Sequence, residues 1–143
     1  MYTLLHSDQW LAVLRIGIGL WWLESFRHKN KAAWLQRGAG IAWAGDVAGK
    51  HRWAFVKTGF DTVVKPRPKT MAYVVVFGEL AIGIGLTLGF LTPVAAFASL
   101  LLNVLYFFLM INDWAEQGQN SMMALIAVVI LGTHAWTTWS VDH

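Results

Sequence analysis

The sequence contains no cysteine among its 143 residues. It therefore has no disulfide bond, no thiolate metal ligand and no cysteine nucleophile. Charged residues are also scarce, at 13%, whereas soluble domains contain about 25%. Hydrophobic residues make up 57% of the chain, and nine residues are tryptophan, which is enriched where a membrane meets water. This composition excludes a disordered chain and a soluble globular domain, and it predicts an integral membrane protein.

Three apolar segments have about the 20 residues that a helix needs to cross a bilayer, and a fourth, residues 10–26, is mostly apolar but contains Arg15 and Glu24. In a single membrane domain that covers residues 1–143, we expect these spans at about residues 10–26, 71–90, 93–111 and 121–139. None of them alternates polar and apolar residues as a barrel strand does. The predicted fold is all-α, an integral membrane four-helix bundle with an amphipathic interfacial loop, residues 27–70, between spans 1 and 2.

The basic residues are concentrated in that loop. Ten of the eleven Lys and Arg lie between Arg27 and Lys69, and the eleventh, Arg15, lies inside the first span. Cytoplasmic loops carry the excess of Lys and Arg in membrane proteins. We therefore predict a multi-pass protein of the inner or cell membrane, with loop 27–70 in the cytoplasm and both termini outside. This topology explains the net charge of +3 without nucleic acid, which we do not expect as a partner.

The two halves of the loop have different patterns. Trp53, Val56, Phe60 and Val63 recur at helical spacing, which predicts an amphipathic helix lying in the membrane interface. The first half contains four glycines, Gly38, Gly40, Gly45 and Gly49. Glycines at this density indicate a segment broken into turns.

Charged side chains inside a span are costly, so each is a functional candidate. At about 1.5 Å of rise per residue, Arg15 lies roughly 8 Å, Glu79 roughly 16 Å and Asn103 roughly 15 Å below the outer face. The three side chains are close enough in depth to meet, because the long Arg15 side chain covers much of the difference. Two interpretations stay open. Either Arg15 and Glu79 are a buried structural pair, or the cluster faces a cavity and contacts a quinone carbonyl, an oxyanion or a proton.

The candidate catalytic residues are Arg15 and Glu79. The candidate quinone site consists of Arg15, Glu79, Asn103, Tyr106 and Trp22. Tyr106 and Trp22 belong to it because aromatic side chains flank quinone rings, although such residues more often face lipid or the core. The expected cofactor is thus a quinone that is not covalently bound, and we expect no metal site.

The histidines raise the question of haem. Under the predicted topology His6 and His134 share the outer side, and His28 and His51 share the cytoplasmic side. A bis-His haem is therefore geometrically allowed, but a lone histidine near a span end is more often an interfacial or core residue. We do not expect haem. The chain also lacks the Walker A, HExxH and CxxC motifs, so redox chemistry would need a lipid-soluble cofactor or one held by another subunit.

Several segments, taken in order, carry a family resemblance. They are RIGIGLWWL at 15–23, Trp53-Ala-Phe with Pro66, GELAIGIGLTLGFLTPVAA at 78–96, Asn103 to Tyr106, Gly118 with Asn120, and Ser140-Val141-Asp142. In these segments and over most of its length, the chain resembles the DoxX/DoxD family of small four-helix membrane proteins. Arg15 and Glu79 are the positions that we carry over as family-like polar sites.

The resemblance implies a set of functions. DoxD-like members include a subunit of thiosulfate:quinone oxidoreductase, which passes electrons from thiosulfate to membrane quinone. Other DoxX-like members are linked to oxidative-stress or respiratory assemblies. The chain departs from this pattern in its Trp- and Gly-rich first loop and in lacking cysteine, so a partner would have to supply any thiol or metal for thiosulfate chemistry.

Three functions stay open. The first is a subunit of a quinone-linked redox complex, which would make the chain part of a quinone-reducing oxidoreductase. The second is a non-catalytic structural or accessory subunit of a larger respiratory or electron-transfer complex. The third is a small carrier, which four short spans without clear inverted repeats do not favour. In each case we expect membrane lipid as a partner, together with a hetero-oligomeric membrane complex or a homo-oligomer.

Overall fold

The structure, a computed structural model, describes residues 4–143 and is helical without strands over that range. Its elements are α1 (Ser7–His28), the π-helical turn η1 (Ala32–Gln36), α2 (Ala39–Gly49), α3 (Ala54–Gly59), the π-helical turn η2 (Phe60–Val64), α4 (Pro68–Leu88), α5 (Thr92–Leu109) and α6 (Trp114–Thr133). The all-α prediction is confirmed for the described residues.

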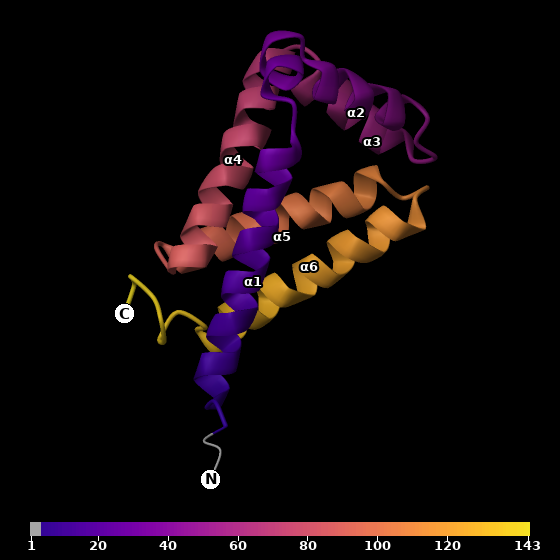
Figure 1. Ribbon diagram of the computed structural model, residues 1–143. Coiled ribbons are helices and arrows are strands. Elements are labelled where there is room, and N and C mark those ends of the chain that lie inside the picture. The colour runs from indigo at the N-terminus through magenta and orange to yellow at the C-terminus, as the bar shows by residue number, and fades with distance from the viewer. Residues whose placement is uncertain (1–3) are drawn as a thin grey trace.

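The four long helices form two antiparallel pairs (Figure 1). α1 packs along α4, α5 packs along α6, and a tight turn joins α4 to α5. The two short helices α2 and α3 lie together at the end where α4 begins. The core lies where the two pairs meet, and it includes Ile18, Trp22, Leu86, Ala96 and Ile130. This arrangement leaves one end of the bundle covered by α2 and α3.

Only part of the predicted membrane bundle is confirmed. Among the described residues, α4 and α5 are the two helices that are long and apolar enough to cross a membrane. α1 does not meet this criterion, because Arg15 and Glu24 lower its hydropathy. α6 does not meet it either, because it begins with the polar stretch Glu116–Ser121. Four membrane spans therefore stay a prediction, although the four long helices are present.

The last helix begins and ends earlier than the expected span at residues 121–139. The Asp113 carboxylate caps its first turn by accepting hydrogen bonds from the backbone N–H groups of Ala115 and Glu116. At the other end His134 has a left-handed backbone, with φ of 52°. A local cap and a local break thus set these limits, whereas hydropathy alone indicates only the apolar middle.

The loop between the first and second long helices is itself helical. The predicted amphipathic helix is present as α3 and η2, which together cover residues 54–64. The prediction that the glycine-rich half consists of turns is wrong, because this half forms α2. Gly40 explains why glycine is tolerated in α2, since a Cβ at this position would overlap the Trp34 ring. Close packing between helices thus outweighs the weak intrinsic helix propensity of glycine.

At Gly19, α1 packs tightly against α4. A Cβ on Gly19 would lie 2.5 Å from Thr87 Oγ1 and 2.6 Å from the Thr87 backbone nitrogen, whereas a Cβ on Gly17 would meet nothing within 4 Å. We expect Gly19→Ala to destabilise the protein by roughly 1–3 kcal/mol, because backbone cannot move aside. We expect Gly17→Ala to stabilise it by up to about 1 kcal/mol through helix propensity. Thermal unfolding in detergent compares the two, and effects of the same sign would contradict this packing.

Candidate functional site

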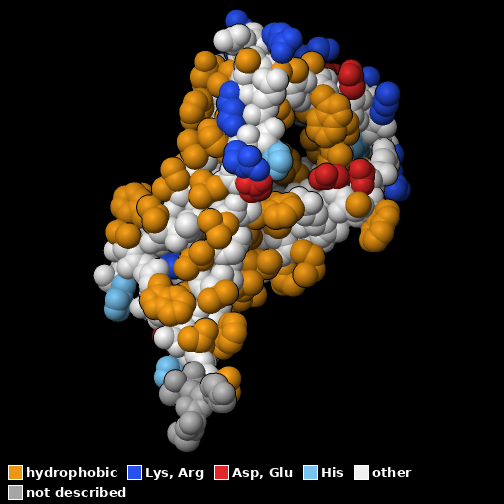
Figure 2. Space-filling model, viewed as in Figure 1, with side chains coloured by type: hydrophobic (Ala, Val, Ile, Leu, Met, Phe, Trp, Pro, Cys, Tyr) orange, Lys and Arg blue, Asp and Glu red, His pale blue; other side chains and the backbone are white. Residues whose placement is uncertain are grey.

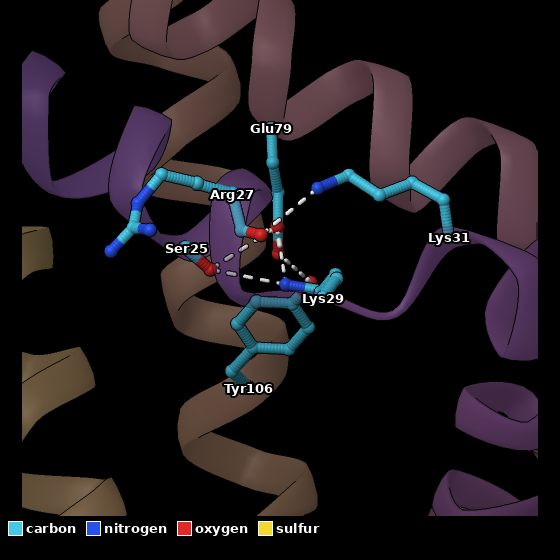
Figure 3. Close-up of polar contacts among 6 residues, drawn as sticks. All are labelled: Ser25, Arg27, Lys29, Lys31, Glu79 and Tyr106. Atoms are coloured by element: carbon cyan, nitrogen blue, oxygen red, sulfur yellow. Dashed lines mark hydrogen bonds and ion pairs between the residues drawn. The ribbon is translucent and has the colours of Figure 1, made fainter.

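Glu79 lies in the middle of α4 and is buried, at 2% exposure. Its carboxylate contacts three side chains, two from the end of α1 and one from α5 (Figure 3). Lys29 Nζ pairs with Oε2 at 2.5 Å, and Ser25 Oγ donates a hydrogen bond to Oε2 at 3.2 Å. Tyr106 Oη, from α5, donates to Oε1 at 3.0 Å. Both carboxylate oxygens are therefore hydrogen-bonded, and the charge of Lys29 compensates that of Glu79.

Lys29 is the residue directly after α1, which ends at His28. Its extended backbone, with φ of −67° and ψ of 133°, carries the chain away from the helix axis. Lys29 Nζ also donates to Ser25 Oγ at 3.0 Å and lies 5.3 Å from the centre of the Trp34 ring. The neighbouring Arg27 instead pairs with Glu24 on the surface at 2.6 Å, and its guanidinium points away from Glu79 (Figure 3).

A second buried group links α1 to α5. Trp22 Nε1 donates to Ser99 Oγ at 2.9 Å. The Asn103 side-chain amide donates to the Ser99 carbonyl at 2.8 Å and to Ser99 Oγ at 3.3 Å. Asn103 is fully buried, and within the described residues its Oδ1 has no hydrogen-bond partner. The site thus contains one buried acceptor that the protein leaves unsatisfied.

Both groups contribute residues to the lining of one cavity of about 290 Å³. Its aromatic lining residues are Trp21, Trp22, Trp34, Trp43 and Tyr106. Its main polar lining residues are Ser25, Lys29, Glu79, Asn103, Glu116, Gln119 and Asn120. In Figure 2 the surface is hollowed beside the end where the Lys and Arg side chains gather. A few polar groups within an otherwise aromatic and apolar wall are typical of small-molecule sites.

The structure brings together four of the five residues predicted for the quinone site. Trp22, Glu79, Asn103 and Tyr106 all line the cavity, and the fifth, Arg15, does not. The expected contact between Arg15 and Glu79 is wrong. Glu79 pairs with Lys29, whereas Arg15 Nη2 donates to the Trp139 carbonyl at 2.6 Å. The depth estimate for Arg15 fails because its long side chain extends toward the α4–α5 turn, not toward the middle of the bundle.

The space that Arg15 occupies depends on Gly89. Gly89 ends α4 in a left-handed conformation, with φ of 67°, and a Cβ there would overlap both Arg15 Nη1 and Ser140 Oγ. Residues 139–142, the C-terminal strap, run across this turn. The Ser140 hydroxyl donates to the Gly89 carbonyl at 2.7 Å, and the Asp142 amide donates to the same oxygen at 2.8 Å. Arg15 is therefore enclosed between the turn and the strap.

Asp142 makes the strap dependent on pH. Partial desolvation acts to raise the pKa of Asp142, but hydrogen bonds from the Thr92 and Leu91 amides and the charge of Arg15 outweigh it, so this pKa is lowered. Stabilisation by a carboxylate of lowered pKa is complete above the unfolded pKa of about 3.9 and is lost as the pH falls through the folded pKa.

We therefore expect the Leu91 and Thr92 amides to lose protection from hydrogen exchange as the pH falls below about 3.9. Asp142 accepts from these amides at 2.7 and 2.6 Å, so Asp142→Asn should weaken the protection at neutral pH as well. Exchange measured by NMR and corrected for the intrinsic rate checks both effects. Protection that stays constant between neutral and strongly acidic pH would contradict the role of Asp142.

His51 has a structural position. The Trp53 amide donates to His51 Nδ1 at 3.0 Å, and Nε2 lies 2.6 Å from the Phe108 carbonyl. Since a carbonyl can only accept, Nε2 carries the proton. Both ring nitrogens are thereby engaged in holding the connection between α2 and α3 against α5. Across residues 4–143 no group of three or more His, Cys, Asp or Glu side chains is placed to hold a metal ion.

Lys29 is the site residue that the sequence analysis misses. By composition it is one of several basic residues that follow the first span, and nothing in that cluster separates it from Arg27 and Lys31. A helical stripe provides the missing signal. Positions 18, 22, 25 and 29 recur at spacings of three and four residues, so they share one face of α1. Lys29 extends the face on which Ile18 and Trp22 are buried.

An all-α fold, two apolar helices of spanning length and a buried ion pair in an aromatic cavity are features that a small helical membrane protein would show. The DoxX family model matches residues 10–112, and the chain belongs to the DoxX family. The resemblance seen in the sequence is thereby confirmed. No curated protein and no solved structure matches the chain significantly. The matched region runs from α1 to the end of α5 and includes Lys29, Glu79 and Asn103.

Proposed function

We propose that this protein is a membrane subunit of a quinone-linked redox complex and that it binds a quinone head group in the cavity around Glu79. One observation carries the proposal: an aromatic-walled cavity of about 290 Å³ that contains the buried Lys29–Glu79–Tyr106 network. A planar, apolar ring with polar oxygens needs such a combination of aromatic faces and a few hydrogen-bonding groups.

The residues present fit a quinone head group. An ammonium group has three N–H donors. Lys29 Nζ directs two of them to Glu79 and Ser25, so one is left for an oxygen of the ligand. A bound quinone would supply two-electron, two-proton chemistry. The chain itself would contribute groups that exchange protons, because Tyr106 and Lys29 both donate to the Glu79 carboxylate.

The electrons in this proposal come from a partner subunit. The chain has no cysteine, so it offers no thiol for sulfur chemistry and no thiolate ligand for a redox metal. A small donor such as thiosulfate, which the family resemblance suggests, would be oxidised on that partner. The function of this chain would then be to hold the quinone and to handle its protons.

We also infer that α1 and α6 cross the membrane beside α4 and α5. Large apolar side chains are exposed on all four helices, among them Leu20 at 52%, Val74 at 58%, Leu105 at 62% and Leu125 at 56%. Lipid solvates such side chains, whereas water does not. Figure 2 shows the Lys and Arg side chains at the end formed by α2 and α3, which supports placing that end in the cytoplasm.

Quinone binding by the purified full chain tests the proposal. Calorimetric titration with decylubiquinone should give saturable binding to one site. Ala44 on α2 lines the cavity, so Ala44→Phe should fill the space and abolish binding. Ala42 lies on the same helix and is exposed, which makes Ala42→Phe a matched control that should leave binding intact. No saturable binding by the unmodified chain, or equal effects of the two variants, would overturn the proposal.

A second candidate, a structural or accessory subunit, is favoured by the apolar side chains exposed on α1 and α6. These two helices are not apolar enough to pass the spanning criterion, so burial against neighbouring subunits would stabilise them in a bilayer. Native mass after gentle extraction tests this function. A large redox assembly whose activity survives Ala44→Phe would favour the accessory function, and a lone chain without quinone would favour the carrier.

A further inference from the structure

We propose that a second cavity, at the end of the molecule formed by α2 and α3, binds the phosphate head group of an anionic phospholipid. This basic cavity has a volume of about 470 Å³. It lies where α2 packs against η1, η2 and α4. Its lining and that of the proposed quinone cavity have only Ile41 in common. The proposal therefore depends on the membrane character of α4 and not on quinone binding.

Three basic side chains from different elements line the basic cavity. Arg37 follows η1, Lys65 follows η2, and Lys69 lies in the first turn of α4. Asp46 and Asp61 also line it, so three positive and two negative charges give a net charge of +1. Lys65 lies 3.9 Å from Asp61 and pairs with it. Arg37 and Lys69 are exposed and form no ion pair within residues 4–143, so both are available to a phosphate.

The starts of α2 and α4 add to the positive potential of the cavity. Gly38, the N-cap of α2, and Pro68, the first residue of α4, both belong to its lining. Neither helix has a side-chain cap or an acidic residue in its first turn. The partial positive charge of each helix start is therefore not neutralised locally. The two helix starts strengthen a site whose main charges are those of Arg37 and Lys69.

The surface beside Lys69 favours a lipid over a free phosphate. Lys69, Tyr73 and Phe77 follow one another at intervals of four residues, so they share one face of α4. Tyr73 is 49% exposed and Phe77 is 46% exposed, and their rings stack with centres 5.7 Å apart. A phosphate bound at Lys69 therefore lies at one end of an exposed aromatic surface, on which the acyl chains of the same lipid can pack.

The position of the basic cavity also matches the head-group layer of a membrane. Pro68 begins α4, which is long and apolar enough to cross a bilayer. In the neighbouring segment α3–η2, Phe55 is 68% exposed and Val63 is 60% exposed, as in a helix that lies in the membrane interface. Figure 2 shows that Lys and Arg side chains gather at this end. Basic pockets at the cytoplasmic side of membrane helices bind anionic head groups.

Native mass spectrometry of the full chain in detergent measures lipid binding and tests the proposal. We expect phosphatidylglycerol to bind about tenfold more tightly than phosphatidylcholine with the same acyl chains, which corresponds to about 1.4 kcal/mol. The double variant Arg37→Gln, Lys69→Gln should bring this ratio close to one. The double variant Arg52→Gln, Lys57→Gln removes the same charge from exposed positions outside the cavity, so it should keep the ratio.

Glycerol 3-phosphate distinguishes a lipid site from a site for a free phosphate. It carries the phosphate without acyl chains, so at millimolar concentration it should leave phosphatidylglycerol bound. Displacement of the lipid by this compound would overturn the proposal. Equal binding of the two lipids to the unmodified chain would overturn it too, as would equal loss of the ratio in the two double variants.

Two single variants keep this test separate from that of the quinone site. Ala42 lines the basic cavity and not the quinone cavity, whereas Ala44 lines only the quinone cavity. Ala42→Phe should therefore weaken phosphatidylglycerol binding and leave decylubiquinone binding intact, and Ala44→Phe should do the reverse. Lipid selectivity that survives Ala42→Phe would contradict the basic cavity as the binding site, and the proposed quinone site would be unaffected.

Discussion

Replacing Lys29 with methionine should cost about 3–5 kcal/mol of folding free energy, because it leaves a buried carboxylate without its counter-charge. Glu79 is 2% exposed, and Lys29 is its ion-pair partner. Hydrogen bonds from Ser25 and Tyr106 remain in the variant, but neither supplies a positive charge. Unfolding in detergent, followed by circular dichroism, measures the loss.

The two residues of this ion pair should differ in how much stability their replacement costs. The Lys29 side chain is 16% exposed, whereas that of Glu79 is 2% exposed. The long lysine side chain can turn toward water when its partner is removed. Glu79→Gln should therefore cost less than Lys29→Met. The double variant, Lys29→Met with Glu79→Gln, should recover much of the stability that Lys29→Met loses.

Lys31→Met is the matched control. Lys31 lies two residues from Lys29, and it donates to the Arg27 backbone carbonyl in an exposed position (Figure 3). Surface substitutions of this kind change stability by no more than about 0.5 kcal/mol. A loss of the same size from Lys31→Met and Lys29→Met would show that total charge, not the buried pair, decides the result. Additive effects of Lys29→Met and Glu79→Gln would contradict their pairing.

Gly89→Ala should be the most damaging glycine substitution, at roughly 2–5 kcal/mol. A left-handed backbone costs a residue with a Cβ about 1–2 kcal/mol, and overpacking adds roughly 1–3 kcal/mol. Gly89 meets both conditions, because its φ is 67° and a Cβ there would overlap Arg15 and Ser140.

Gly38→Ala separates the two contributions. Gly38 is also left-handed, with φ of 63°, but a Cβ there would meet nothing within 4 Å. It should therefore cost only the backbone part, about 1–2 kcal/mol. The difference between the two variants in thermal unfolding measures the overlap with Arg15 and the C-terminal strap. Equal losses would show that this space is not closely packed.

The site could be predicted in part from depth along the helices. Counting residues places Glu79 and Asn103 at the same level, and both do line one cavity. The rise per residue gives depth but not the direction in which a side chain extends. The depth alone therefore pairs Arg15 with Glu79, whereas its guanidinium donates to the Trp139 carbonyl near the far end of the chain. Nothing in the local sequence around Arg15 indicates that residue 139 returns to this helix.

The glycine-rich segment shows the same limit in the fold. Gly40, Gly45 and Gly49 suggest turns by intrinsic propensity, but all three lie in α2. The deciding contact is between Gly40 and the Trp34 ring, and it exists only once η1 and α2 have folded against each other. Local propensity is a weak influence that such packing readily overcomes.

The sequence by itself determined the all-α class, the membrane character indicated by α4 and α5, and membership of the DoxX family. These properties depend on composition, on apolar segment length and on the order of motifs, all of which can be read along the chain. The tertiary structure decided that Lys29 neutralises Glu79 and that the C-terminal strap encloses Arg15. Partners of buried charges depend on how each helix is rotated and on where the chain runs after the helix ends. Packing between distant segments sets both, because each buried charge must find a partner in the folded molecule.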